Sequence, residues 1–438
     1  MKEEIFKLVE AYCKSNFGDK TFVPGQSAVP PSGKVFDEEE LVNMVDSVLE
    51  GWWTDGKCAA ELEKQLAEYV GVKHCVLVNS GSSANLLAFG ALTSARLQDK
   101  GIKPGDEVIT VAAGFPTTIN PVLIYGCVPV FLDVDLNTCE MQVEKLEEAL
   151  SEKTKAVFVA HTLGNAFNVK AVKAFCEKHN LWFIEDNCDA LGTEFEGQKT
   201  GSFGDLSTVS FYPAHHMTTA EGGAVFTNSA VLELIVRSMR DWGRDCWCPT
   251  GKDNTCSKRF GWKLGGLPYG YDHKYMYSHI GYNLKMTDIQ AACGLAQIKK
   301  LKAFTEKRKE NYRMLREKLG EFEKYFDFVE PTEGSDPSWF GFIITLKDGC
   351  GFERKKLIEF LTSKRIGTRL VFAGDITKQP YFKTHNVQYR VVGGLENTEK
   401  IMNDTFWIGL YPALGEEQFD YVKECFKEFI EERRNEYD

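Results

Sequence analysis

The sequence has no excess of basic charge, no long apolar run and no hydrophobic leader. Its 52 Lys and Arg residues stand against 63 Asp and Glu residues, which gives a formal net charge of −11. Because nucleic-acid binding depends on a basic surface, we expect no nucleic-acid partner. No stretch reaches the roughly 18 uncharged apolar residues of a membrane-spanning helix, and residues 1–18 have the pattern of an amphipathic helix, not of a signal peptide. We therefore expect a cytoplasmic protein without a membrane partner.

The cysteines do not have the arrangement of a disulfide framework. There are 13 of them, an odd number, and a chain of 438 residues can bury a core without cross-links. Nine are scattered, mostly among apolar residues, and we interpret them as small buried side chains. The other four, Cys188, Cys246, Cys248 and Cys256, form a spaced set.

Short apolar segments alternate with helical patterns between residues 75 and 228. The apolar segments are 75–79, 107–112, 129–134, 156–160, 182–186, 207–211 and 223–227, and the helical patterns cover 83–97, 139–152 and 171–180. Several segments are apolar at consecutive positions, which is typical of strands buried on both faces of a parallel sheet. This alternation predicts an α/β doubly wound fold, whose ligands bind at the C-terminal ends of the strands.

We divide the chain into three parts. A helical segment covers residues 1–50, a large domain covers 51–300, and a smaller C-terminal α/β domain covers 301–438. The large domain includes an irregular loop at about 240–280, rich in Trp, Tyr, Gly and Cys, whose length indicates a functional role. A long helix is predicted from Thr287 to about Leu319.

An anion-binding turn is indicated by the segment NSGSSAN at 79–85, which follows one predicted strand and opens a helix. Gly81 permits a sharp turn, Ser82 and Ser83 supply hydroxyl groups, and the helix N-terminus supplies free N–H groups. Taken alone, this motif is more often an ordinary helix N-cap.

A carboxylate ends another predicted strand, at Glu185 and Asp186. Ligands of α/β sheets bind at such strand ends, so Asp186 can pair with the protonated ring nitrogen of an aromatic cofactor. An aspartate that only caps the following turn fits the pattern equally well.

The segment SFYPAHHMTTAEGG at 210–223 resembles the active-site segment of the nucleotide-sugar aminotransferases, fold-type-I enzymes that use pyridoxal phosphate (PLP). Four further segments occur in that family's order, at 79–85, 104–135, 183–192 and 281–301. The resemblance implies an α/β fold-type-I PLP-enzyme (aspartate-aminotransferase-like) large domain with a mostly parallel sheet. It also implies a smaller C-terminal α/β domain.

One position departs from the aminotransferase pattern. His215 stands where the aminotransferases carry the lysine that binds the cofactor covalently, and no lysine occurs between Lys199 and Lys252. This replacement resembles the 3-dehydratases of the family, which hold pyridoxamine phosphate (PMP) non-covalently. His215 can then act as the base near neutral pH. The alternatives are a histidine without a chemical role and an introduced replacement of lysine.

The four spaced cysteines follow the pattern C-x57-C-x-C-x7-C. Four thiolates suit a [2Fe–2S] cluster or zinc, and the C-x-C pair fits structural zinc poorly. The spacing is similar to that of the iron–sulfur 3-dehydratases that act on CDP-4-keto-6-deoxyglucose. It predicts a cluster held by Cys188, Cys246, Cys248 and Cys256, with the 240–280 loop as the cluster loop. The alternative is four unrelated buried cysteines.

The resemblance also implies roles for individual residues. Gly81, Ser82, Ser83 and Ser210 would bind the cofactor phosphate, Phe115 would stack on the ring, and Asp186 would pair with its nitrogen. His216 would touch phosphate or substrate, and Asn283 would reach the neighbouring subunit's cofactor, which implies a homodimer with shared active sites. Asp189 stands where aminotransferases often place Gln or His near the ring oxygen, so that contact is open.

The implied reaction removes the C3 hydroxyl of a CDP-linked 4-keto-6-deoxyhexose, toward the 3,6-dideoxysugars of bacterial surface polysaccharides. A partner reductase that uses NADH, flavin and an iron–sulfur centre would supply electrons through the cluster. The first alternative is a cluster-free 3-dehydratase that regenerates PMP with glutamate. The others are a sugar aminotransferase, which His215 disfavours, and a catalytically inactive sensor or interaction subunit.

Overall fold

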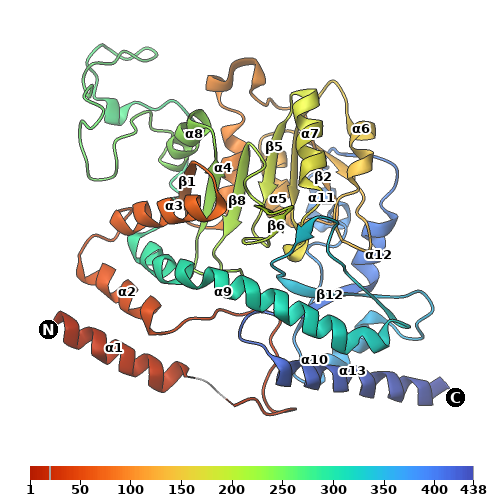
Figure 1. The fold of residues 1–438 in the computed structure, drawn as a ribbon. Coiled ribbons are helices and arrows are strands. Elements are labelled where there is room, and N and C mark those ends of the chain that lie inside the picture. The colour runs from red at the N-terminus through yellow and green to blue at the C-terminus, as the bar shows by residue number, and fades with distance from the viewer. Residues whose placement is uncertain (19–20, 438) are drawn as a thin grey trace.

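An eight-stranded sheet forms the centre of the computed structural model, which describes residues 1–18 and 21–437 (Figure 1). In spatial order its strands are β1 (His74–Val78), β9 (Gly223–Thr227), β8 (Leu206–Ser210), β5 (Trp182–Asp186), β4 (Thr154–Ala160), β2 (Glu107–Val111), β3 (Val128–Leu132) and β14 (Arg390–Val391). β9 runs antiparallel to both of its neighbours, and the other pairs are parallel. The predicted mostly parallel α/β sheet is therefore confirmed.

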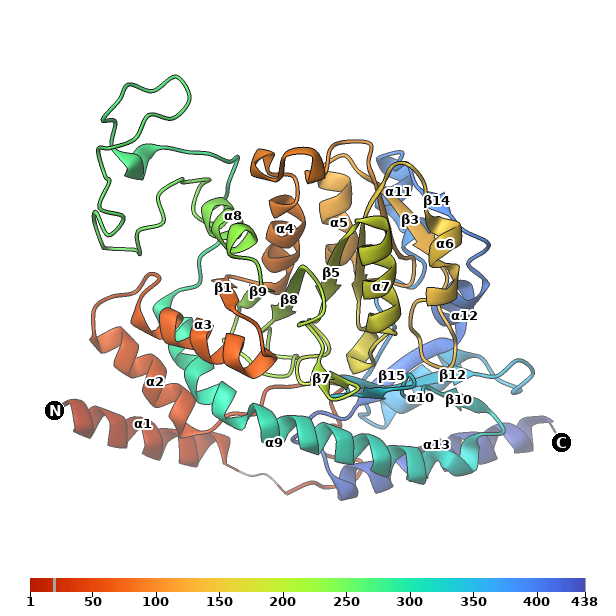
Figure 2. The ribbon, with the colours of Figure 1, turned by 45° about the horizontal axis from the view of Figure 1, so that its top comes forward.

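Helices cover both faces of this sheet (Figure 2). The helices are α1 (Lys2–Phe17), α2 (Glu38–Leu49), α3 (Lys57–Val70), α4 (Gly81–Ala91), α5 (Pro116–Ile124), α6 (Leu146–Ala149), α7 (Val169–His179), α8 (Ala230–Arg240), α9 (Asp288–Leu319), α10 (Arg354–Ser363), α11 (Pro380–Thr384), α12 (Glu396–Asp404) and α13 (Glu416–Tyr437). Adjacent residues of β5 face opposite cores, because Ile184 packs with α4 and α8, whereas Phe183 packs with α7. This burial on both sides explains why the strands are apolar at consecutive positions. Among the described helices, none is both long and apolar enough to cross a bilayer.

The C-terminal part builds a second, antiparallel sheet in the order β10-β12-β15-β13. Its strands are β10 (Phe326–Phe328), β12 (Gly341–Leu346), β15 (Thr405–Gly409) and β13 (Thr368–Arg369). A small third sheet consists of β11 (Ser335–Asp336), β6 (Glu194–Phe195) and β7 (Gln198–Lys199). It joins the two parts of the chain, since β11 pairs with β6.

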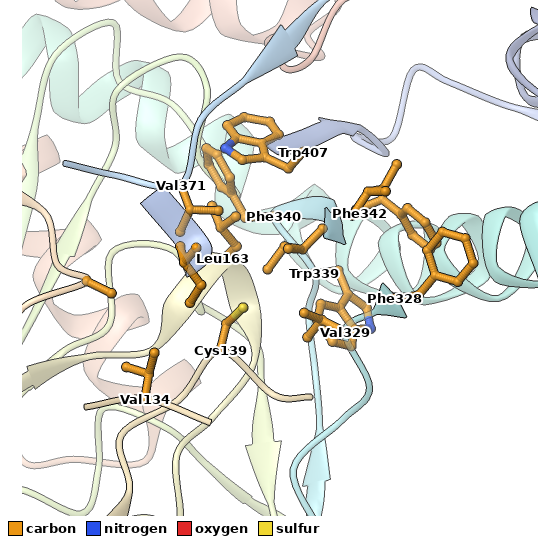
Figure 3. Close-up of a cluster of buried hydrophobic side chains, with 14 of the residues drawn as sticks. Val134, Cys139, Leu163, Phe328, Val329, Trp339, Phe340, Phe342, Val371 and Trp407 are labelled. Atoms are coloured by element: carbon orange, nitrogen blue, oxygen red, sulfur yellow. The ribbon is translucent and has the colours of Figure 1, made fainter. Parts of the chain in front are cut away.

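A continuous apolar core lies between the large sheet and the C-terminal sheet. Figure 3 shows Leu163, which follows β4, beside Val371 and Phe340 from the C-terminal part, and all three are buried in one cluster. Trp407 of β15 belongs to the same cluster and packs edge-to-face on Phe340 at 5.5 Å between ring centroids. Burial of these large side chains stabilises the packing of the C-terminal sheet against the large sheet.

The structure confirms one predicted irregular region and contradicts one predicted helix. As predicted, the described residues 241–287 contain no α-helix or strand, only the 3₁₀ turn η4 (His273–Tyr275), and the loop extends from the body beside α8 (Figures 1 and 2). The helix predicted over 139–152 is wrong. Cys139 has φ +55° and Met141 bridges Val134, so only the 3₁₀ turn η2 (Val143–Lys145) and α6 are helical there.

The longest helix, α9, has 32 residues and begins where the sequence predicts. The Thr287 hydroxyl accepts a hydrogen bond from the Gln290 amide, and the Gln290 side chain accepts one from the Thr287 amide, which completes a capping box. The helix runs beside α2, α3 and α13, so it connects the N-terminal, central and C-terminal parts of the fold.

Loss of this cap should measurably destabilise the protein. We expect Thr287→Ala to lower the free energy of unfolding by about 1 kcal/mol, since an N-cap hydroxyl satisfies an otherwise unpaired amide. Denaturant unfolding monitored by circular dichroism measures the change. Thr362→Ala, an exposed threonine inside α10, is the matched control and should cost nothing. Equal effects of the two substitutions would contradict the role of the cap.

Candidate active site

A cavity of about 620 Å³ lies at the C-terminal ends of the parallel strands. The loops after β1, β2, β4, β5 and β8 line one side, and Phe340, Arg369 and Trp407 of the C-terminal part line the other. Six residues predicted for the cofactor or the chemistry meet here, together with Cys188: Gly81, Ser82, Phe115, Asp186, Ser210 and His215. The position agrees with the rule that α/β sheets bind ligands at strand ends.

The N-terminus of α4 forms one end of the cavity. A Cβ atom on Gly81 would lie 2.5 Å from Cβ of Ser210, so only glycine lets the helix start approach β8 this closely. Ser82 and Ser210 line the cavity, and the first amides of α4 are free of helical partners. These groups can hold a phosphate. Ser83 has a different place, because its amide and its hydroxyl both bond to the Ser80 hydroxyl, at 3.1 and 3.0 Å.

Asp186 is a buried carboxylate at the end of β5, and only 5% of the residue is exposed. Its Oδ2 accepts hydrogen bonds from Asn85 Nδ2 of α4 at 2.7 Å and from Thr118 Oγ1 of α5 at 2.6 Å. Asn85 is itself oriented by Thr208, whose hydroxyl donates to Asn85 Oδ1 at 2.6 Å. The carboxylate is thus held by side chains of two helices while it lines the cavity.

His215 lines the same cavity. Its Nδ1 lies 3.2 Å from Oδ1 of Asp189, within range of a charge interaction but without hydrogen-bond geometry. This leaves Nε2 as the ring atom available to a ligand. The His215 carbonyl accepts a hydrogen bond from Arg308 Nη2 at 3.3 Å. Of the described residues that line the cavity, none is a lysine.

Arg308 of α9 is a buried charge that the sequence did not reveal. Its Nη1 donates to the carbonyl of Trp339 at 3.0 Å, and the residue is 1% exposed. Burial lowers the pKa of Arg308 to about 10, against the opposing effect of the Asp189 carboxylate. Because these partners lie far apart in sequence, no local pattern could have identified the residue.

His216 and Asn283 lie outside the cavity lining. His216 is buried and its Nε2 donates to the Ser338 carbonyl at 2.7 Å, so it anchors the active-site loop to the C-terminal part. The Asn283 side chain accepts a hydrogen bond from Lys285 at 2.8 Å, and its backbone forms an isolated antiparallel β-bridge with Asp241. Phe115 does line the cavity, where it is 47% exposed and packs edge-on against Phe372.

The four spaced cysteines are not assembled into a metal site. Within residues 1–18 and 21–437, no group of three or more His, Cys, Asp or Glu side chains is arranged to hold a metal ion. Cys188 lies in the active-site cavity, whereas Cys246 and Cys248 line a separate cavity of about 730 Å³ beside α8. The predicted four-thiolate site therefore has no support in the structure, because the end of β5 and the 240–280 loop are parts of different cavities.

The thiols of Cys188, Cys246 and Cys248 also differ chemically. Burial, followed by the Asp186 charge, raises the pKa of Cys188 well above its usual range, which keeps this thiol protonated. Burial raises the pKa of Cys246 to about 11. Burial acts to raise the pKa of Cys248. Hydrogen bonds outweigh this effect and lower the pKa to about 7, and they come from Thr255, from the Cys256 backbone, and from the Cys246 and Cys256 thiols. The three loop cysteines are therefore neighbours, and the lower pKa makes the Cys248 thiol easier to ionise than the Cys246 thiol.

The cavity fits PLP or PMP on the chemistry of its groups. It combines an anion site at a helix start, a buried carboxylate for a ring nitrogen, and an aromatic ring from Phe115. On a mostly parallel sheet with an antiparallel β9, this arrangement defines the fold-type-I class of PLP enzymes. A family model agrees: the DegT/DnrJ/EryC1/StrS aminotransferase family matches residues 35–427, and the chain belongs to that family.

Known proteins resemble this chain over nearly its whole length. The lipopolysaccharide biosynthesis protein RfbH of Salmonella typhimurium is 56% identical over 430 residues, covering 98% of each chain. The dTDP-4-dehydro-2,6-dideoxy-D-glucose 3-dehydratase of Saccharopolyspora spinosa is 48% identical, covering 98% of this chain and 92% of the relative. The structure of the E. coli GDP-4-keto-6-deoxy-D-mannose 3-dehydratase with bound hydrated PLP superimposes with a TM-score of 0.81 at 28% identity. The match covers 91% of this chain and 98% of the E. coli chain.

The buried His216 should make stability depend on pH. Burial, and then the Arg308 charge, hold the pKa of His216 well below 6.5 in the folded protein. Below pH 6.5 the unfolded chain binds a proton that the folded chain does not, so folded stability falls as the pH is lowered through this window. We expect a loss of up to about 1.4 kcal/mol per pH unit from this residue.

A non-titrating substitution tests the effect. His216→Gln keeps an N–H donor for the Ser338 carbonyl and should flatten the slope of unfolding free energy against pH below 6.5. Denaturant unfolding at a series of pH values measures the slope, and His385→Gln at an exposed position is the matched control. An unchanged slope in His216→Gln would contradict the assignment.

Proposed function

We propose that this protein is a nucleotide-sugar 3-dehydratase that holds PMP non-covalently and uses His215 as its base. The observation that carries the proposal is the placement of His215 in a PLP-type cavity that, among the described residues, has no lysine in its lining. The names of two relatives support the reaction, since both are 3-dehydratases of nucleotide-linked keto-deoxyhexoses.

Each group has a definite task in this proposal. When bound, the cofactor supplies an amine that condenses with the sugar C4 ketone and a ring that accepts an electron pair. Asp186 keeps the ring nitrogen protonated, and Ser82 and Ser210 hold the phosphate beside the α4 N-terminus. His215 Nε2 takes a proton next to the ring and can return it to the departing C3 hydroxyl.

The surroundings of His215 suit a base that must not bond covalently. Imidazole forms no stable link to the cofactor aldehyde, so the cofactor stays free to carry an amine. The Asp189 carboxylate at 3.2 Å from Nδ1 stabilises the positive charge that the ring acquires when it takes a proton. Arg308 fixes the His215 backbone and balances the Asp189 charge from the other side.

The substrate class in this proposal is a nucleotide-linked 4-keto-6-deoxyhexose. The sequence resemblance proposes CDP as its nucleotide, whereas the relatives' names carry dTDP and GDP. We also propose a homodimer, in which Asn283 and the exposed 240–280 loop face the second subunit. The three nucleotide forms are to be assayed side by side.

Removal of the base should separate binding from chemistry. We expect His215→Asn to lower kcat by about 10²- to 10⁴-fold, the usual contribution of a positioned base, while PLP binding changes little. Exchange of the C4′ protons of PMP with deuterated water, followed by NMR with substrate present, reports the proton transfer itself. His216→Gln is the matched control and should retain exchange. Full exchange in His215→Asn would refute the assignment of the base.

The route by which the cofactor is restored defines two versions of the enzyme. The cluster-free version, which recovers PMP with glutamate, agrees with the lack of an assembled metal site among the described residues. The second version receives electrons from a partner reductase through a [2Fe–2S] cluster. One observation favours it: Cys246, Cys248 and Cys256 are neighbours in the 240–280 loop, and Cys248 is readily ionised.

Iron analysis distinguishes the two versions. The cluster-free version predicts a protein that stays iron-free after anaerobic purification and reconstitution with iron and sulfide, and that turns over with glutamate. About two irons and two sulfides per chain, with visible bands that bleach on reduction with dithionite, would establish the cluster instead. Cys248→Ser is the informative variant and Cys350→Ser the control, because Cys350 lies outside the spaced set.

A further inference from the structure

The mechanism above leaves one buried histidine of the cavity unused. His161 directly follows β4, is 0% exposed and lines the cavity with Asp186 and His215. Its ring stacks on Phe167 with 4.3 Å between ring centroids and 9° between planes. The ring orientation is therefore fixed by packing.

The tautomer of His161 is fixed by Glu185. Nε2 of His161 lies 3.1 Å from Oε2 of Glu185. The same carboxylate accepts backbone N–H groups from Gly201 at 2.8 Å, Phe203 at 2.8 Å and Gly204 at 2.7 Å. A carboxyl group surrounded by three backbone donors acts as an acceptor, so Nε2 of His161 carries the hydrogen. Nδ1 is consequently an acceptor.

This acceptor has no partner within the described part of the chain. His161 Nδ1 is fully buried and makes no hydrogen bond there. Buried polar atoms are almost always hydrogen-bonded, so this acceptor calls for a partner, and a donor group on a bound ligand would supply one. Asp189 cannot serve as that donor when ionised, since a carboxylate only accepts.

The order of the strands indicates which group of the cofactor would lie nearest to His161. β8, β5 and β4 are successive neighbours, so Ser210, Asp186 and His161 follow one another along the edge of the sheet. The His161 amide also bonds the Asp186 carbonyl at 3.1 Å, which places the two residues side by side. On the PLP ring the phosphate arm, the ring nitrogen and the ring hydroxyl lie on three different sides. With the phosphate at Ser210 and the nitrogen at Asp186, the hydroxyl faces β4.

We propose that Nδ1 of His161 accepts a hydrogen bond from the ring hydroxyl of the bound PLP or PMP, and that Glu185 positions it for this contact. The inference rests on the proposed function only in placing this cofactor in the cavity. It makes His161 a positioning residue that sets the tilt of the ring between Asp186 and His215. It also supplies a contact to the ring oxygen, whereas Oδ1 of Asp189 lies 3.2 Å from Nδ1 of His215.

Binding of PLP without substrate tests the contact. We expect His161→Phe, which keeps an aromatic ring against Phe167, to weaken PLP binding about 3- to 10-fold, the usual range for one lost hydrogen bond. The neutral hydroxyl also loses its acceptor, so the absorbance band of the ionised hydroxyl should appear at lower pH than in the wild type. His161→Gln retains both a donor and an acceptor and should restore most of the affinity, and His385→Phe at an exposed position is the matched control.

The outcomes separate this inference from the proposed function. A wild-type protein that binds no PLP would refute the cofactor site itself. Wild-type PLP binding combined with unchanged affinity and unchanged spectral pH dependence in His161→Phe would overturn the inference alone. A His161→Gln variant that is as weak as His161→Phe would also overturn it, because the loss would then not follow the hydrogen bond. Thermal unfolding of each variant confirms that the fold is retained.

Discussion

The active site depends on one buried carboxylate that is held in place by its neighbours. Asp186 cannot be left without partners in an apolar interior, and Asn85 and Thr118 provide them from α4 and α5. These two hydrogen bonds join β5 to the helices that follow β1 and β2. Gly81 and Ser82 begin α4, and Phe115 immediately precedes α5, so fixing the carboxylate also fixes the phosphate end and the aromatic wall of the cavity.

A second set of contacts links the cavity to the C-terminal part of the chain. Arg308 on α9 bonds the carbonyls of His215 and Trp339, and His216 bonds the carbonyl of Ser338. Phe340 and Trp407 then complete the cavity wall from within the apolar core that joins the two sheets. The proposed base therefore lies where both parts of the fold meet, and its position follows from their packing.

The cysteines show the limit of arguing from spacing. The motif C-x57-C-x-C-x7-C predicts four ligands of one cluster, but 57 residues separate Cys188 from Cys246, the first of the other three. Such a distance along the chain places no constraint on the distance in space. The three loop cysteines are neighbours because only seven residues or fewer separate them, whereas Cys188 belongs to the strand end beside Asp186.

The sequence by itself determined the α/β sheet, the family and six cofactor or catalytic residues of the cavity lining. These depend on local patterns: consecutive apolar strands, a Ser- and Gly-rich helix start, and the segment around His215. Only the tertiary structure decided that Asn85 and Thr118 hold Asp186, that Arg308 bonds the His215 carbonyl, and that Ser83 and His216 are not among the residues lining the cavity. It also showed that residues 139–152 do not form one helix, because Met141 forms a β-bridge with Val134 and only η2 and α6 are helical there. For Asp186, Arg308 and His216 the physical reason is the same: a buried polar group takes its partner from a segment that packs against it, and the fold as a whole decides which segment that is.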